Sequence, residues 1–380
     1  MGEVGAVKDD GEVREEGPAG TGGASGHGGR ERPMPEGCPP CAEEGGTGYA
    51  EHRPLLFSIA YRMTGSVSDA EDIVQEAFAR LARALRGGTP VNEPKAYLAR
   101  TATRLALNHL RSARLHRESY PGTWLPEPVL TGPGPEEYAE MADSLSMAFL
   151  VVLESLSPAE RAVFLLHEVF GYEHKEIAEI TGTSAANSRQ ILARARRHVD
   201  EGRPRFEASR AQREEVARRF FAAADGGDLD GLLRALAPDV VYHGDGGGKA
   251  RAVAAPLHGR DRVARFLAGL FRRIRKREAS LRIVEVNGQP GAVTYDRDGH
   301  VLNVLALDIA DGEVQGIRCV VNPDKLRHLG RVSGLPRQLP PETATGVTER
   351  NDPAPTRKGP AARARKDAGD QDTPDRAQDI

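Results

Sequence analysis

The side chains best suited to chemistry in this sequence lie on a short basic segment, residues 184–199. Asn187, Gln190, Arg194 and Arg197 recur there at spacings of three or four residues, which places them on one face of a helix. Asn, Gln and Arg can each hydrogen-bond a base edge in bidentate fashion, and a good pair gives roughly 1–3 kcal/mol of discrimination. The pattern predicts a helix that reads DNA. The alternative is a small helical bundle with a solvated basic face.

Two shorter helices are expected to position that segment. Ser157 and Glu160 form an N-terminal capping box with Pro158 in the first helical position, and Gly171 ends the run. A second helix is expected over residues 173–180, followed by a tight turn. A short helix, a glycine turn and a basic helix together predict a helix-turn-helix whose last element enters the major groove. The packing side of the basic helix is small or apolar: Ala185, Ser188, Ile191, Leu192, Ala195 and Val199.

A second helical block lies upstream, where an acidic helix precedes a basic one. An apolar-rich helix is expected over residues 53–63. Ser68 and Glu71 predict another capping box, for a helix whose first turns hold acids, as the helix dipole favours. Pro94 then starts a third helix, and residues 95–117 contain six basic residues and no acid. Hydrophobic stripes are expected to join these helices into one domain.

Both blocks resemble the sigma-70 family of transcription initiation factors, in its small extracytoplasmic-function type. Residues 156–161 (LSPAER), 172–178 (YEHKEIA) and 188–197 are similar to region four, which in that family reads the −35 promoter element. Residues 69–78 (DAEDIVQEAF) are similar to the region-two segment that binds the polymerase clamp, and residues 97–112 to the segment that melts and reads the −10 element. The resemblance implies a sigma factor with core RNA polymerase and promoter DNA as partners.

The resemblance also implies three contact surfaces. The polymerase-binding residues would be Asp69, Glu71, Asp72, Gln75 and Glu76. The −10 element would be contacted by Arg100, Arg104, Asn108, Arg111 and Arg114. The −35 element would be contacted by Ser184, Asn187, Arg189, Gln190, Arg194 and Arg197. Phosphate contacts from lysine and arginine would supply an affinity that falls steeply with salt, and the linker between the two readers would set the promoter spacing.

The chain beyond residue 210 predicts a third domain of α+β type. Helical patterns over residues 212–224, after Asp228 and over residues 259–276 are followed by strand patterns punctuated by Asn-Gly and Asp-Gly turns, which predict an antiparallel meander. One strand is expected at residues 240–243, before the helix at 259–276, and the strands of the meander are expected at residues 281–286, 292–295, 301–310 and 313–321. Residues 220–228 (FFAAADGGD) and 236–240 (LAPDV) resemble a SnoaL-like domain of the nuclear-transport-factor-two superfamily. A sigma factor with such a domain resembles the sigma-J type.

That resemblance implies that the third domain regulates activity in cis, in place of a separate anti-sigma protein. Residues 124–128 (WLPEP) lie between the helical domains, and residues 245–249 (DGGGK) and 322–326 (NPDKL) lie in the third. We expect the third domain to dock on this linker and on one helical domain, where burying the Trp124 indole stabilises by about 2–3 kcal/mol. The alternative is that Trp124 packs only on its own helical domain. The expected regulatory contacts are Trp124, Leu125, Asp245, Gly246, Gly247, Asn322 and Asp324.

The expected organisation has six parts. They are a disordered tail (1–48), a region-two-like domain (49–120), a linker (121–142), a region-four-like helix-turn-helix (143–202), a SnoaL-like domain (211–330) and a second disordered tail (331–380). A rival interpretation is a SnoaL-type enzyme or ligand sensor with appended DNA-binding helices, using Asp225, Asp239, Tyr242, His243 and Asp245. A third is a repressor with a single reading domain, which has no use for residues 69–78. We expect no enzyme and no cofactor, and a small-molecule ligand of the third domain stays an open alternative.

Composition fits this organisation. The 380 residues carry a formal net charge of −3, so any nucleic-acid surface must be local. No apolar run approaches the ~20 residues of a membrane span, and no basic region followed by an apolar core opens the chain, so we expect a cytoplasmic protein. Three cysteines argue against a disulfide framework. Cys38 and Cys41 have redox or zinc spacing but lack a second ligand pair in a Gly- and Pro-rich tail, so no metal is expected.

Overall fold

The structure is a computed structural model that describes residues 46–132, 145–202 and 209–334; side chains are described except at 46–47, 113–118 and 201–202. The chain divides into two units, residues 1–49 and 50–380, and the packing below is that of the second. Cys38, Cys41 and both expected tails up to residue 45 and from residue 335 lie outside the described residues. Among the helices that are described, none is both long and apolar enough to cross a membrane.

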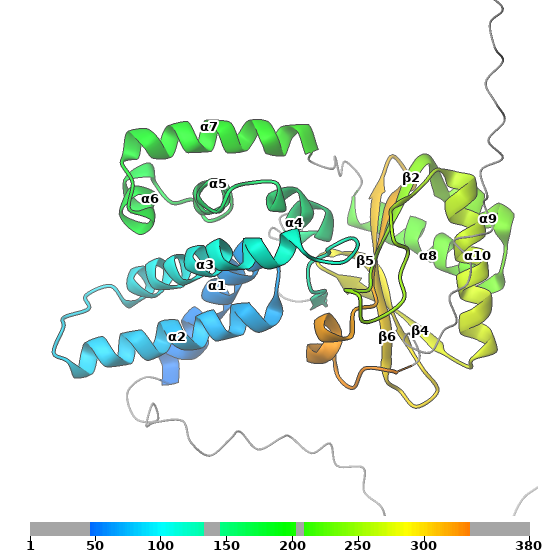
Figure 1. Ribbon diagram of the computed structural model, residues 1–380, viewed down its shortest axis with the longest axis horizontal. Coiled ribbons are helices and arrows are strands. Elements are labelled where there is room, and N and C mark those ends of the chain that lie inside the picture. Colours follow the sequence, from blue (N-terminus) through cyan, green and yellow to red (C-terminus); the bar gives the residue numbers. More distant parts are fainter. Residues whose placement is uncertain (1–45, 133–144, 203–208, 335–380) are drawn as a thin grey trace, which may run out of the picture. The chain divides into compact units, whose positions relative to one another are not determined.

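Three helices form the first helical domain: α1 (Gly46–Thr64), α2 (Val67–Arg86) and α3 (Pro94–Glu118) (Figure 1). The predicted capping box at Ser68 is wrong. Ser66 caps α2 instead, and its side chain accepts a hydrogen bond from the Asp69 amide at 3.2 Å. The chain turns at Gly65, whose φ is 69°, so that Ser66 is the last extended residue before the helix.

The second helical domain contains α4 (Met147–Glu154), α5 (Pro158–Phe164), a short π-helix (Leu165–Val169), α6 (His174–Thr181) and α7 (Ala185–Gly202). The capping box of Ser157 and Glu160 is confirmed. Gly182, with φ of 73°, ends α6 in the left-handed conformation that a tight turn needs. The buried side chains of both helical domains form one continuous cluster, from Leu56 in α1 to Val199 in α7.

The third domain places helices against a mixed sheet. Its helices are α8 (Arg210–Gly226), α9 (Leu229–Ala235) and α10 (Arg260–Lys276). Its strands are β2 (Leu236–Asp245), β3 (Leu257–His258), β4 (Ser280–Val286), β5 (Gln289–Tyr295), β6 (Val301–Ala310) and β7 (Glu313–Val320), and a 3-10 helix follows at Pro323–Leu329. The linker adds β1 (Leu130–Thr131), and the sheet order is β1-β4-β5-β6-β7-β2-β3.

The predicted antiparallel meander is confirmed for β4 to β7, whereas β2, which precedes α10 and whose pairing was not predicted, pairs with β7 in parallel. A long connection containing α10 separates β2 from β4, so no tight turn forces β2 to be antiparallel to its neighbour. The predicted Asn-Gly and Asp-Gly turns are confirmed where β4 meets β5 and where β6 meets β7. Asn287, Gly288, Asp311 and Gly312 all have positive φ, as a type I′ turn requires.

The two faces of the sheet serve different partners, because successive side chains of a strand point to opposite faces. Leu305 and Leu307 of β6 pack in the cluster with α8, α9 and α10, whereas Val304 and Ala306 pack with Leu125 of the linker. Figure 1 shows α8, α9 and α10 together along one side of the sheet. The linker therefore lies on the face that these helices leave free, and its edge strand β1 was not predicted from the sequence.

Candidate nucleic-acid interface and linker junction

Helix α7 exposes the polar face that the sequence predicts. Its packing side is buried at Ser188, Ile191, Leu192, Ala195 and Val199. Ser184 lies before the helix and caps it, accepting from the Asn187 amide at 3.1 Å. The side chains of Asn187, Arg189, Gln190, Arg194 and Arg197 are exposed. Helix α6 is fixed against α7 by a 3.0 Å hydrogen bond between His174 Nδ1 and Ser188 Oγ, a contact that sequence reasoning did not single out.

The basic helix α3 lies against α6, and two of its arginines are engaged there. Arg104 donates to the carbonyl oxygens of Ile180 at 3.0 Å and Glu179 at 2.8 Å. Arg100 pairs with the Glu179 carboxylate at 2.9 Å. These acceptors are at the C-terminal end of α6, where a helix attracts cations. Asn108 and Arg111 are exposed, and the side chain of Arg114 lies outside the described residues.

The five predicted polymerase-binding residues of α2 fall into two groups. Asp72 and Gln75 are exposed, and neither has a hydrogen bond or ion pair to another described residue. The other three are held by bases: Asp69 by His109 at 3.2 Å, Glu71 by Arg53 at 2.5 Å, and Glu76 by Arg80 at 2.8 Å and Arg83 at 2.9 Å. The hydrogen bond from Arg80, followed by that from Arg83, lowers the pKa of Glu76. The exposed pair is therefore the part of this surface most open to a partner.

Glu127 of the linker completes the N-terminus of α2. Its carboxylate accepts from the Val67 amide at 2.7 Å, the Ser68 amide at 3.3 Å and the Ser66 hydroxyl at 2.9 Å. The first amides of a helix have no partner within the helix, and a negative charge there is favoured by the dipole. A linker side chain thus caps the helix that carries the predicted polymerase-binding residues. Glu127 belongs to the WLPEP segment, but the sequence predicted no role for it.

Trp124 lies between the first helical domain and the third domain. A Cβ added at Gly65 would come within 2.7 Å of the indole, so the ring packs directly on the turn between α1 and α2. The ammonium of Lys325 in the third domain lies 4.3 Å from the centre of the same ring, which is within cation–π range. The side chain therefore contacts both domains that the sequence offered as alternatives.

A buried carboxylate joins the linker to the third domain. Asp245, at the end of β2, is fully buried and accepts from the Tyr120 hydroxyl at 2.6 Å and from the Leu125 amide at 2.8 Å. Lys325 pairs with the same carboxylate at 2.7 Å and also donates to the Leu125 carbonyl oxygen. Burial, followed by the bond to Asp245, raises the pKa of Tyr120. Tyr120 belongs to no recognised motif, and no sequence signal identified it.

The glycine loop after Asp245 makes room for the linker. A Cβ at Gly247 would lie 2.7 Å from the Tyr120 hydroxyl, and one at Gly248 would lie 2.8 Å from the Pro121 ring. Both glycines have positive φ. Asn322 Nδ2 completes the contact by donating to the Tyr120 hydroxyl at 2.8 Å. The remaining predicted regulatory residues act within the domain: Gly246 packs against Ala250, and Asp324 pairs with Lys249 and with Arg327 at 2.7 Å.

Asn287 makes a second junction, which sequence reasoning missed because Asn-Gly reads as an ordinary turn. Its Nδ2 donates to the Tyr61 hydroxyl of α1 at 2.7 Å and to the Leu145 carbonyl oxygen at 3.0 Å. Its Oδ1 accepts from the Val129 amide at 2.9 Å. One fully buried side chain of the third domain thus contacts the first helical domain, the linker and the residues before α4.

The residues proposed for the rival enzyme do not gather around one site. Asp225 and Asp239 are exposed, while Tyr242 is buried among the apolar side chains of the domain core. Burial, followed by the charges of nearby basic groups, lowers the pKa of His243 to about 4. Asp245 is committed to the linker. The arrangement gives no opposed acid and base around a common cavity, as general acid–base catalysis requires.

One group of side chains has the spacing of a cation site. Ligand atoms of Asp296, Asp298 and His300 lie within 4.8 Å of one another in the turn between β5 and β6. Asp296 accepts from the amides of Asp298 at 3.0 Å and His300 at 2.9 Å. Its carboxylate therefore already has a structural role in holding this turn.

Comparisons with known proteins match each helical domain and the third domain. Residues 49–116 match Sigma-70 region 2, residues 146–199 match Sigma-70, region 4, and residues 217–321 match the SnoaL-like domain. The chain is 40% identical over 288 residues to ECF RNA polymerase sigma factor SigJ of Mycobacterium tuberculosis, covering 72% of this chain and 90% of that protein. It is 35% identical over 282 residues to probable ECF RNA polymerase sigma factor SigI of the same species, covering 73% and 93%.

A solved structure extends the similarity to the fold. The crystal structure of Mycobacterium tuberculosis extracytoplasmic function sigma factor SigJ superposes with a TM-score of 0.60 and 37% identity, covering 74% of this chain and 98% of that chain. The predicted fold class, two helical domains followed by a SnoaL-like α+β domain, is confirmed.

Proposed function

The chain belongs to the extracytoplasmic-function RNA polymerase sigma factors, and from this premise we propose that its SnoaL-like domain regulates promoter use in cis by holding the linker between the two DNA readers. As a sigma factor it directs promoter-specific initiation, which is a binding equilibrium and needs no catalytic group. We place this activity in the cytoplasm, where the polymerase works.

The residue roles follow the exposed surfaces. We assign core polymerase binding to the outer side of α2, centred on Asp72 and Gln75. The −35 element is assigned to the exposed face of α7, whose Asn, Gln and Arg side chains suit base edges. The −10 element is assigned to α3, on which Asn108 and Arg111 are exposed.

The arrangement described here is a closed one, and reading a promoter requires it to open. The −35 and −10 elements are separated by roughly 25 base pairs, or about 85 Å of duplex at about 3.4 Å per base pair. In the closed arrangement α3 is in hydrogen-bond contact with α6, beside the reading helix α7. When the two helical domains separate, Arg100 and Arg104 lose their hydrogen bonds to α6 and become available to contact DNA. The release of α3 from α6 is therefore a step of activation.

The linker junction determines how far the readers can separate. Contacts from Tyr120 to Thr131 fix this half of the linker on the third domain. At the far end of the linker, the Leu145 carbonyl oxygen accepts from Asn287, and Met147 of α4 packs with Leu125 on the sheet, so the docked third domain holds both ends of the linker. Once released, a chain of the length of residues 120–146 could extend ~90 Å. A docked third domain thus restricts the distance between the readers, which supports regulation of promoter spacing.

The observation that carries this proposal is the buried Asp245, which bonds the linker backbone at Leu125 and pairs with Lys325. Reconstituted transcription with purified core polymerase tests it, on promoters that differ only in the spacing of the −35 and −10 elements. The Asp245→Asn variant should release the linker and broaden the range of productive spacings. Asp324→Asn is the matched control, because Asp324 pairs only within the third domain.

Two results would count against the proposal. An Asp245→Asn profile as narrow as that of the unaltered chain would show that docking does not set the spacing. The absence of transcripts from the unaltered chain on every promoter tested, despite binding to core polymerase, would contradict the residue assignments themselves.

A further inference from the structure

Helix α10 of the third domain has a strongly one-sided charge. Arg260–Lys276 contains seven basic residues and a single acid, Asp261. Its apolar side is buried against the sheet through Val263, Leu267 and Phe271. An amphipathic helix that buries one side presents its charged residues on the other. The basic residues of α10 thus form an outer surface that the regulation of the linker does not use.

Four of these cations line up along the helix. Arg262, Arg265, Arg272 and Lys276 are exposed, and none has an acidic partner or hydrogen bond among the residues that the structure describes. At about 100° and 1.5 Å per residue, these positions fall within one face and extend over about 21 Å. We call this set the basic stripe.

Two other cations of α10 have partners within the protein, unlike those of the stripe. Arg260 pairs with Glu313 of β7 at 3.1 Å. Arg275 donates to the Ala224 carbonyl oxygen at 3.1 Å, at the C-terminal end of α8. Cations with an acceptor nearby are therefore engaged, whereas those of the stripe are presented to solvent.

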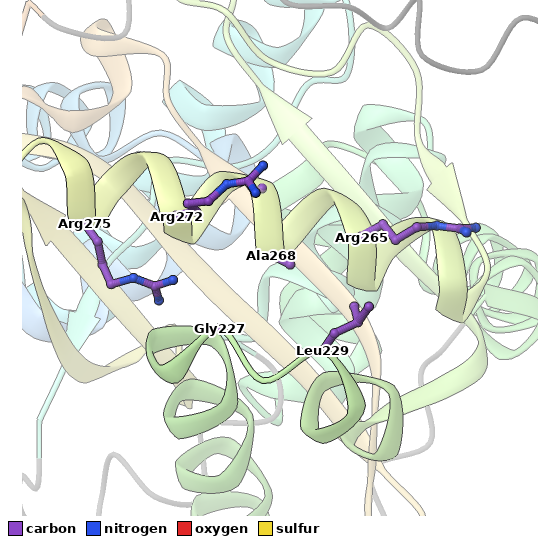
Figure 2. Close-up of a pocket in the computed structure, with 7 residues that line it drawn as sticks. Gly227, Leu229, Arg265, Ala268, Arg272 and Arg275 are labelled. Atoms are coloured by element: carbon purple, nitrogen blue, oxygen red, sulfur yellow. The ribbon is translucent and has the colours of Figure 1, made fainter.

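The helix surface is open at the middle of the stripe. Gly269 lies between Arg265 and Arg272 along α10, and a Cβ added at this glycine would meet no atom within 4 Å. A cavity of about 230 Å³ lies at this point, lined by Arg265, Gly269 and Arg272 together with Leu229 of α9. Figure 2 shows the arginines leaving the helix on either side of Ala268. The missing side chain lets a ligand backbone approach the helix closely.

We propose that the basic stripe binds the phosphate backbone of duplex DNA, as a contact independent of sequence and additional to the −10 and −35 readers. Lysine and arginine supply such contacts, and about 21 Å of duplex axis carries roughly six phosphates on each strand. The stripe consists of cations alone, which matches the uniform negative charge of a phosphate backbone, and the exposed Leu229 of α9 borders its cavity. The inference rests on promoter DNA being the ligand of this family.

The stripe stays accessible while the linker is docked. Leu305 and Leu307 face the helices, whereas Val304 and Ala306 face the linker, so that α10 and the linker lie on opposite faces of the sheet. The third domain can therefore hold the linker on one face and DNA on the other (Figure 1).

The test measures binding of the full chain to a fluorescein-labelled duplex of scrambled sequence by anisotropy, over a range of salt concentrations. The stripe variant carries R262Q, R265Q, R272Q and K276Q. If four phosphate contacts are lost, the slope of log K against log salt becomes shallower by roughly two to four, and affinity at ~100 mM salt falls at least tenfold. The charge-matched control carries R210Q, R218Q, R219Q and R234Q, exposed arginines that each pair with an acid.

A second pair of variants tests the stripe while keeping all of its basic residues. Gly269→Glu places a carboxylate in the centre of the stripe, and Gly269→Gln adds the same bulk without charge. Both substitutions fit the open space and favour the helix. Gly269→Glu should weaken DNA binding at least fivefold, and Gly269→Gln should leave it within twofold, with both variants melting no earlier than the unaltered chain.

Three results would overturn the proposal. The first is an unchanged salt slope in the stripe variant. The second is an equal change in the control, which would indicate a general charge effect. The third is a loss of affinity for core polymerase with DNA binding intact, which would identify an acidic protein surface as the partner. Run-off transcription at low salt separates this from the proposed function, because it should persist in every stripe variant.

Discussion

At the residue scale, the glycine loop of the third domain lies directly against Tyr120 of the linker. Gly247 has φ of 57°, and a Cβ there would lie 2.2 Å from Asn322 Nδ2 and 2.7 Å from the Tyr120 hydroxyl to which Asn322 donates. Gly171 has φ of 68° but nothing within 4 Å of the same position. Comparing the same substitution at the two glycines therefore separates the effect of backbone strain from the effect of the close contact with the linker.

Gly247→Ala should displace Asn322 and the Tyr120 hydroxyl that Asn322 bonds, and so loosen the junction, whereas Gly171→Ala should only add the strain of a left-handed residue, about 1–2 kcal/mol. Trp124 is the only tryptophan of the chain and lies in that junction, so its emission reports docking. A red shift is expected for Gly247→Ala alone. An equal shift in both variants, or in neither, would contradict the role given to Gly247.

Sequence reasoning at this scale found the residues with a recognisable pattern. DGGGK and WLPEP identified Asp245, Gly247, Trp124 and Leu125, which the structure brings together. Tyr120 and Asn287 were missed, since a lone tyrosine and a turn asparagine have ordinary surface explanations. Their roles depend on partners more than a hundred residues away, and local spacing contains no information on such contacts.

At the element scale, the main result is that the linker completes two elements of other domains. It supplies the edge strand β1 to the sheet and the Glu127 cap to α2. Periodicity and caps predicted most of the helices that the structure describes, because those signals are local. The cap at Ser66 was misplaced by two residues, and β1 was not found, because a two-residue strand has no period of its own.

The cap on α2 leads to a prediction on polymerase binding. Glu127→Ala leaves the first amides of α2 without their acceptor, which costs about 1 kcal/mol and frays the turn next to Asp69 and Asp72. Binding of the full chain to core polymerase should weaken about fivefold. Asp228→Ala removes the cap of α9 in the third domain and is the matched control. Equal affinities of the two variants for polymerase would show that the cap on α2 has no such role.

At the scale of the whole molecule, the described domains are not independent. The two helical domains share one apolar cluster, and a separate cluster joins Leu125 and Met147 to the outer face of the sheet. Single interactions at surface positions, such as that of Arg100 with Glu179, contribute little, at about 0–1 kcal/mol. The buried pair of Asp245 and Lys325 differs, because removal of one partner leaves an uncompensated charge and costs about 3–5 kcal/mol.

This difference predicts how the chain unfolds. The unaltered chain should lose Trp124 fluorescence and far-ultraviolet circular dichroism in one coincident urea transition, because the junction couples its domains. In Asp245→Asn the linker should detach first, so the fluorescence transition should precede the loss of secondary structure. Asp324→Asn changes the same charge on the surface of the third domain and should keep the two transitions together. Coincident transitions in Asp245→Asn would mean that the domains are held together without this carboxylate, and the restriction that docking places on the linker would then need another source.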